Sequence, residues 1–132
     1  MSATETALQI LQKNSIGVMA TNNNGTPNSR YMTFTFVESK LYTVAKKDST
    51  AVTEIEANPA THILLGYEGE DVLKTFLEIE GHAVVTKNDV VKNQLLKKYP
   101  AVAAEELVVI QVTPTRARIM NKSGEQQEDV HL

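Results

Sequence analysis

The sequence predicts a mainly β fold with short α-helices: an antiparallel barrel, closed or split, of about six strands with about three helices at its openings. Apolar or aromatic residues alternate with polar ones along several short segments, which is the period of a strand. Hairpin turns and short connections join these segments and favour antiparallel pairing. Strands and helices do not alternate as they do in doubly wound folds, so a barrel is the natural package.

The first half of the chain is predicted to hold one helix and three strands. The helix covers residues 3–13, and the strands cover residues 16–21, 30–37 and 41–45. Ala7, Ile10 and Leu11 share one face of the helix. Asn22–Gly25 ends the first strand, because Asn and Gly tolerate the positive φ of a tight turn. Glu38–Lys40 is the turn of a second hairpin.

The second half is predicted to hold two helices and three strands. The helices cover residues 50–58 and 87–99, the strands cover 61–66, 73–85 and 107–120, and a polar loop covers 66–71. Ser49 or Thr50 is a good N-cap for the first of these helices, and Asn58-Pro59 ends it. Pro100 ends the second helix. Gly81 is a candidate bulge, and Pro114 indicates a bend or an edge in the last strand.

Length and composition limit the classes of function. The 132 residues suit one domain, which we expect over residues 1–120, followed by a polar, frayed tail over residues 121–132. The formal charge of −3 makes nucleic acid a poor candidate partner, and the absence of cysteine excludes disulfides and thiolate sites. The N-terminal residues lack the pattern of a signal peptide, and no apolar run has the length of a membrane span. We therefore expect a soluble, cytoplasmic protein.

The turn Lys46–Thr50 is the strongest candidate for an anion site. It immediately precedes a predicted helix, whose N-terminus exposes unpaired N–H groups and the positive end of the helix dipole. Its two lysines and two hydroxyls would suit a phosphate, and Arg30 on the neighbouring strand could add a bidentate contact. On the residues alone, a solvated turn with an ordinary N-cap is the more frequent interpretation.

The remaining titratable residues predict no site. His62, His82 and His131 lie far apart and lack metal-ligand spacing, so no metal is expected. Glu78 and Glu80 share one face of a strand, which indicates the solvated side of a half-buried strand. The pairs Glu54/Glu56 and Glu105/Glu106 are expected to be ordinary solvated charges. No phosphate loop or hydrolase motif is present.

A series of short motifs resembles a known family in order and spacing. The motifs are Ile16–Thr21, Asn24–Pro27, Ser29–Phe34, Leu41–Tyr42, Lys47–Ser49, Asn58–Pro59, Glu80–Ala83 and Val112–Pro114. The series resembles the pyridoxamine 5'-phosphate oxidase-like superfamily of FMN-binding split barrels, especially its general-stress-protein-like branch. The resemblance covers about residues 5–120. It implies a six-stranded antiparallel split β-barrel that works as a homodimer, with FMN in a groove between the subunits.

The resemblance also implies which residues hold the cofactor. They are Arg30, Tyr31, Met32 and Thr33 on the second strand, and Val44, Ala45, Lys46, Lys47, Ser49 and Thr50 at the turn. Three positions depart from the family pattern: Ala45 stands where Thr is common, Ala51 where Lys is common, and Met120 where a Trp is often found.

The implied function is FMN binding, with flavin-dependent oxidoreduction of an unknown small substrate. No catalytic residue is predicted, because the flavin ring carries the chemistry. One alternative is a non-catalytic flavin-binding or stress-sensing module, which Ala45 and Ala51 favour. Another is a haem- or deazaflavin-binding split barrel, for which His82 is the candidate axial ligand. Pyridoxamine phosphate oxidase activity itself is not expected, because the chain is short and its polar tail matches no substrate-binding segment.

Overall fold

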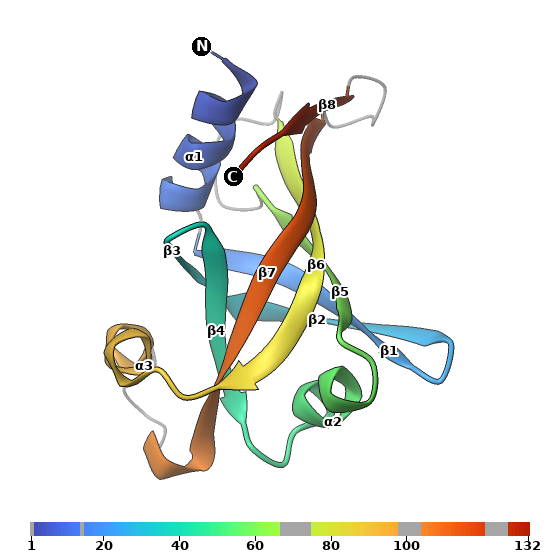
Figure 1. Ribbon diagram of the computed structural model, residues 1–132, viewed down its shortest axis with the longest axis vertical. Coiled ribbons are helices and arrows are strands. Elements are labelled where there is room, and N and C mark those ends of the chain that lie inside the picture. The colour runs from blue at the N-terminus through green and yellow to red at the C-terminus, as the bar shows by residue number, and fades with distance from the viewer. Residues whose placement is uncertain (1, 14, 67–74, 98–103, 121–126) are drawn as a thin grey trace.

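The computed structural model describes residues 2–13, 15–66, 75–97, 104–120 and 127–132. Among these residues the chain forms eight strands, three α-helices and one 3-10 turn (Figure 1). The strands are β1 (Ile16–Asn23), β2 (Thr26–Thr33), β3 (Thr35–Val37), β4 (Lys40–Lys46), β5 (Ala60–Leu65), β6 (Phe76–Thr86), β7 (Leu107–Met120) and β8 (Gln127–Val130). The helices are α1 (Ala3–Lys13), α2 (Thr50–Ala57), α3 (Asp89–Leu96) and the 3-10 turn η1 (Ala104–Glu106).

The strands form one antiparallel sheet in the order β2-β1-β5-β6-β7-β4-β3, with β8 added to β7. The two ends of this order, β2 and β3, are consecutive in the chain and are separated by Phe34 alone. Phe34 is buried, and its N–H donates to the Ser15 carbonyl at 2.6 Å. Close by, the Thr43 hydroxyl donates to the Thr33 carbonyl at 2.7 Å. The sheet therefore closes into a barrel through a bend at Phe34.

This bend accounts for one of the two strands that the structure has beyond the prediction, and β8 is the other. The sequence predicted six strands and one continuous strand over residues 30–37, whereas the structure divides that segment into β2 and β3. Alternation continues through Phe34, so the pattern alone does not reveal that the partner changes from β1 to β4. The predicted class, a mainly β antiparallel split barrel with three helices, is confirmed.

Both predicted hairpin turns are confirmed. Asn24 and Gly25 have φ of 51° and 94° and form the two-residue loop between β1 and β2. The second loop, between β3 and β4, uses Glu38 and Ser39 at φ of 49° and 65°. Positive φ at both loop residues matches the twist of a tight hairpin.

The long β6–β7 ladder contains the bulge predicted at Gly81. The register pairs Glu80 with Arg116 but Gly81 with Pro114, so Thr115 is the extra residue. A Cβ atom at Gly81 would lie 2.6 Å from the Thr113 carbonyl oxygen, so the close approach of the two strands requires glycine here. Pro114 thus occupies the bend in β7 that its lack of an N–H allows.

The helices close the barrel and extend its core. α1 and α2 lie at opposite ends of the barrel, and α3 lies beside β4 (Figure 1). The main core is centred on fully buried side chains, including Met19, Leu41, Ile63, Leu77, Ile110 and Val112. Val91 and Leu95 of α3 build a second cluster with Tyr42, Val44 and Val109. Each such apolar side chain contributes about 1.5–3 kcal/mol when fully buried.

The polar C-terminal segment is more ordered than the sequence predicts. We expected residues 121–132 to fray, but Gln127–Val130 forms β8 and pairs with Ala117–Met120 of β7. Val130 is buried in the main core. A four-residue strand with three polar residues has too little alternation to be recognised from sequence. Residues 121–126 lie outside the described part of the chain.

Two further predictions fall partly on residues that the structure does not describe. The predicted loop 66–71 and the start of the predicted strand at Leu73 include residues 67–74, and the predicted stop at Pro100 lies within residues 98–103. Within the described ranges, no helix combines the length and the apolar character needed to cross a membrane.

Candidate functional site

The structure places the predicted residues of β2 on both faces of the barrel wall. Arg30 pairs in register with the buried Met19, and its side chain lies on the inner face. Met32 also packs against the main core. Tyr31 pairs with Val18 on the outer face and is 61% exposed. Arg30 and Tyr31 are neighbours in sequence, but Arg30 therefore faces the interior of the barrel and Tyr31 faces the outside.

Arg30 belongs to a polar network between β1, β2 and α2. Its Nη1 donates to the Met19 carbonyl at 3.3 Å and to the Thr21 hydroxyl at 2.7 Å, and its Nη2 lies 3.5 Å from Oε1 of Glu54. The Thr21 hydroxyl donates to the same oxygen of Glu54 at 2.6 Å. Asn28 donates to the other oxygen at 2.7 Å. The Glu54 carboxylate is thus held by three side chains.

The burial of Glu54 contradicts its prediction as a solvated charge. Its side chain is only 5% exposed, whereas Glu56 is exposed as expected. Ala51, Val52 and Ile55 form the buried stripe of α2, and position 54 flanks that stripe. The hydrogen bond from Thr21 is the largest influence on the carboxyl and holds its pKa below the ordinary value, although burial acts in the opposite direction.

The turn Lys46–Thr50 begins α2 as predicted. Ser49 is the N-cap, and its Oγ accepts from the backbone N–H of Val52 at 3.4 Å. Lys46, Lys47 and Thr50 are exposed. The Lys47 N–H donates to the Glu106 carbonyl at 3.0 Å, which ties the turn to η1. Two exposed ammonium groups and a hydroxyl at a helix N-terminus fit an anion such as a phosphate.

The other residues predicted at this turn have structural roles. Val44 is buried in the cluster around α3, and Ala45 packs against the main core. Ala51 is buried, so the position where the family commonly carries Lys is occupied here by a small core residue. Asp48 is exposed.

A second charged cluster lies on the outer face of β5, β6 and β7. Arg118 donates to both oxygens of Glu78, from Nε at 2.6 Å and from Nη2 at 3.1 Å. His62 Nε2 lies 2.5 Å from Oε1 of Glu78 and 4.0 Å from Oε1 of Glu80. The prediction that Glu78 is solvated is therefore wrong, because this carboxylate is buried under its two partners.

The hydrogen-bonded pair of Arg118 and Glu78 has the largest influence on the pKa values of both residues. The hydrogen bond from Arg118 is the largest influence on Glu78 and lowers its pKa, against the effect of burial. The same bond raises the pKa of Arg118. Sequence spacing did not connect His62 with Glu78 and Glu80, because only the strand register places His62 opposite Glu80 and diagonal to Glu78.

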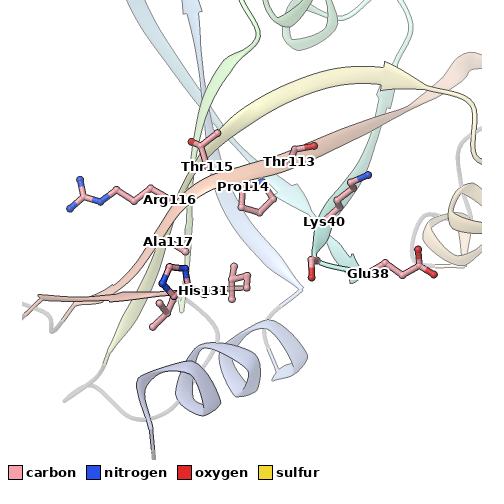
Figure 2. A pocket seen from close by; sticks show the side chains of 11 residues that line it. Glu38, Lys40, Thr113, Pro114, Thr115, Arg116, Ala117 and His131 are labelled. Carbon is pink, nitrogen blue, oxygen red and sulfur yellow. The ribbon is translucent and has the colours of Figure 1, made fainter.

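Two pockets among the described residues are lined by side chains that belong to neither cluster. One of about 320 Å³ lies between the β3–β4 turn, the bend of β7 and the C-terminal segment (Figure 2). Its charged side chains do not converge: Figure 2 shows Lys40 and Arg116 pointing to opposite sides of it. An apolar hollow of about 370 Å³ lies between α2 and β6, with Ile55, Pro59 and Val84 in its lining. Neither pocket has the few convergent polar groups of a small-molecule site.

Comparison with known proteins finds relatives of one family that match most of the chain. The family described as pyridoxamine 5'-phosphate oxidase matches residues 3–121. General stress protein 26 of Bacillus subtilis (strain 168) is 33% identical over 119 residues, which cover 86% of this chain and 85% of that protein. The crystal structure of General Stress Protein 26 from Bacillus anthracis str. Sterne is 28% identical and superimposes with a TM-score of 0.79 over 100% of both chains. A Listeria innocua protein that is named after pyridoxamine 5'-phosphate oxidase gives a TM-score of 0.80 at 28% identity, over 92% of this chain and all of that one.

More distant proteins of known structure share the fold and are named after different cofactors. A FAD-binding protein from Mesorhizobium loti is 15% identical (TM-score 0.72, over 89% of this chain and 92% of that one). A heme binding protein from Mycobacterium smegmatis is 16% identical (TM-score 0.76, over 99% and 58%), and an F420 reductase is 21% identical (TM-score 0.69, over 83% and 93%). At these identities the likeness concerns the fold alone.

Proposed function

The chain belongs to the pyridoxamine 5'-phosphate oxidase family, and on this basis we propose that it binds FMN and transfers electrons or hydride between the flavin and a small substrate. The observation that carries the proposal is the exposed turn Lys46–Thr50 at the N-terminus of α2. Two lysines and an exposed threonine hydroxyl there offer the charge and the donors that the phosphate of FMN needs.

The turn residues are available to bind a phosphate, whereas Arg30 already has partners within the chain. Lys46, Lys47 and Thr50 are exposed and would contact the phosphate directly. Arg30 is 24% exposed and already bound to Thr21 and Glu54, so a phosphate would have to compete with a carboxylate for its guanidinium. We therefore propose that the turn supplies the main contacts and that Arg30 contributes partly by holding α2 in place through Glu54.

We further propose that the protein works as a homodimer, with the flavin between two copies. The support is a row of apolar side chains on the outer face, where the register aligns Tyr31, Val18 and Leu64 across β2, β1 and β5. Tyr31 is largely exposed in the single chain, and Ile16 beside this row is 38% exposed. An exposed aromatic in an apolar row suits an isologous contact between two copies.

In this proposal the protein binds and orients the cofactor, and no side chain is assigned a catalytic role. Bound FMN would supply hydride or single-electron transfer through its ring system. The chain's own residues would hold the phosphate at the turn and exclude water from the groove between the two subunits.

A second candidate is flavin binding without turnover. The specific observation that favours it is the loss of two family phosphate partners at Ala45 and Ala51, both of which pack inward here. Weak phosphate contacts would suit a sensing module whose occupancy follows the flavin concentration. Steady-state turnover with a nicotinamide donor would exclude this candidate.

The deciding experiment is an absorption spectrum of the purified chain before and after addition of FMN. A flavin spectrum that bleaches with a reductant and recovers in air supports FMN binding and redox competence. A Soret band would instead assign the protein to the haem-binding alternative. A chain that is colourless and takes up no FMN in an equilibrium dialysis experiment contradicts the proposal.

A further inference from the structure

We propose that His62, Glu78 and Glu80 form a binding site for one divalent cation of the Zn²⁺ type on the outer face of β5 and β6. One ligand atom from each residue lies within 4.8 Å of the other two. The set combines one imidazole nitrogen with two carboxylate oxygens, which are ligands that Zn²⁺ accepts. The proposal is independent of flavin binding, because none of these residues belongs to the turn Lys46–Thr50.

The backbone holds the three ligands in fixed relative positions. His62 lies directly opposite Glu80 in the antiparallel ladder, and Glu78 is two residues further along the same strand and on the same face. A site on two paired strands is more rigid than a site on loops. The strand register thus brings together three metal ligands that are separated in sequence.

The distances are compatible with coordination after small side-chain movements. His62 Nε2 is 2.5 Å from Glu78 and 4.0 Å from Glu80. Ligands at about 2.1 Å from a tetrahedral Zn²⁺ lie about 3.4 Å from each other, between these two values. The side chains of His62 and Glu80 are 44% and 45% exposed, so both can adjust and the cation can enter from solvent.

Arg118 would hold one of the three ligands, Glu78, in position for the cation. It donates to both oxygens of the buried Glu78 and so fixes the orientation of that carboxylate. Hydrogen bonds of this kind commonly hold the carboxylate ligands of a metal. With Glu78 and Glu80 ionised, Arg118 charged and His62 neutral, the four side chains carry a formal charge of −1, which favours a cation. Three protein ligands would leave a fourth position for water.

The test is titration of the full, tag-free and chelator-treated chain with ZnCl₂ in an isothermal calorimeter. We expect one saturable equivalent per chain, and we expect His62→Ala and Glu80→Gln each to weaken binding at least tenfold. His82→Ala and Asp129→Asn are matched controls, because they remove an exposed imidazole on β6 and an exposed carboxylate on β8. These controls should stay within twofold of the unmodified chain.

Thermal unfolding gives a second measurement on the same proteins. A cation that binds only the folded chain raises its melting temperature. Zn²⁺ should therefore raise the melting temperature of the unmodified chain and of His82→Ala, but not that of His62→Ala. The absence of saturable binding, or an equal loss of affinity in His62→Ala and His82→Ala, would overturn the proposal. Both substituted ligands are exposed, so the variants should fold.

Discussion

The hydroxyl of Thr21 donates a 2.6 Å hydrogen bond to Oε1 of Glu54, and both residues are buried. This contact joins β1 to α2, the helix that carries the candidate phosphate turn at its N-terminus. Arg30 and Asn28 complete the link from β2. The position of the candidate site therefore depends on a polar network inside the barrel.

Thr21→Val should destabilise the protein by about 1–3 kcal/mol, because valine keeps the shape of threonine but removes the donor to a buried carboxylate. Urea denaturation would measure the loss as a lower midpoint. Thr113→Val is the control, since Thr113 is exposed and the change should stay within about 0.5 kcal/mol. A Thr21→Val protein as stable as the unmodified chain would show that the hydrogen bond contributes nothing.

Stability should fall in acid through Glu54 and Glu78. Hydrogen bonds from Thr21 to Glu54 and from Arg118 to Glu78 hold the pKa of each carboxyl below its ordinary value in the folded chain. A depressed pKa contributes stability that is present above the unfolded value and is lost as pH falls through the folded value. The free energy of unfolding should therefore decline below about pH 4.5, and less steeply in Glu78→Gln, which has one such carboxyl fewer. Glu56→Gln, at an exposed position, should keep the original slope.

Gly81→Ala should destabilise the barrel by about 1–3 kcal/mol, because the new Cβ atom would meet the Thr113 carbonyl at 2.6 Å and the backbone would have to shift. Gly25→Ala is the comparison variant. Its added Cβ atom would have no heavy atom within 4 Å, so its loss of stability would come only from backbone strain at a φ of 94°. Gly25→Asn should recover part of that loss, because Asn tolerates positive φ. Chemical denaturation of the three variants separates the steric effect from the conformational one.

Lys47→Ala should weaken FMN binding about threefold to tenfold, measured by quenching of flavin fluorescence, without a change in melting temperature. Loss of one charged contact to a phosphate has this size when the contact is exposed to solvent. Arg30→Ala should weaken FMN binding and also lower the melting temperature, because Arg30 holds Glu54. Lys13→Ala, at the end of α1, is the charge-matched control. Equal affinities in all four proteins would place the phosphate elsewhere.

Tyr31→Glu should convert the proposed dimer to a monomer, measured by gel filtration with light scattering at micromolar concentration. A carboxylate in the middle of an apolar contact loses its hydration without gaining a partner. The folded chain should survive, since Tyr31 is 61% exposed. Val90→Glu, on an exposed position of α3 away from this row, should leave the oligomeric state unchanged. An unmodified chain that is already monomeric would contradict the dimer directly.

Local features of the fold could be predicted because short-range chemistry determines them. The Asn24-Gly25 turn, the Ser49 N-cap and the Gly81 bulge each follow from what one or two residues allow the backbone to do. The bend at Phe34 could not be predicted in this way, because it reflects a change of partner strand. The order of β8 was missed for a similar reason, since its stability comes from pairing with β7.

The candidate sites were predictable only where the residues are adjacent in sequence. The exposed turn before α2 was expected, and its lysines and hydroxyls lie where the pattern placed them. Glu54 on α2 and Glu78 on β6 were expected in solvent, but each is buried and bound to partners on strands distant in sequence. The position of Glu54 beside the stripe of Val52 and Ile55 was the available signal for its burial. The contact of His62 with Glu78 depends on strand register, which a single sequence does not encode locally.

The bend at Phe34 also has a consequence for the order of folding. The β1–β2 and β3–β4 hairpins each join residues close in sequence and meet at this one buried side chain. The ladder that closes the barrel joins residues as distant as Leu41 and Val112. Because distant pairings carry a larger loop-closure entropy, we expect the two hairpins to form early and the β4–β7 ladder to limit the folding rate. The two hairpins would then rearrange about the bend at Phe34 until the β4–β7 ladder forms and completes the barrel.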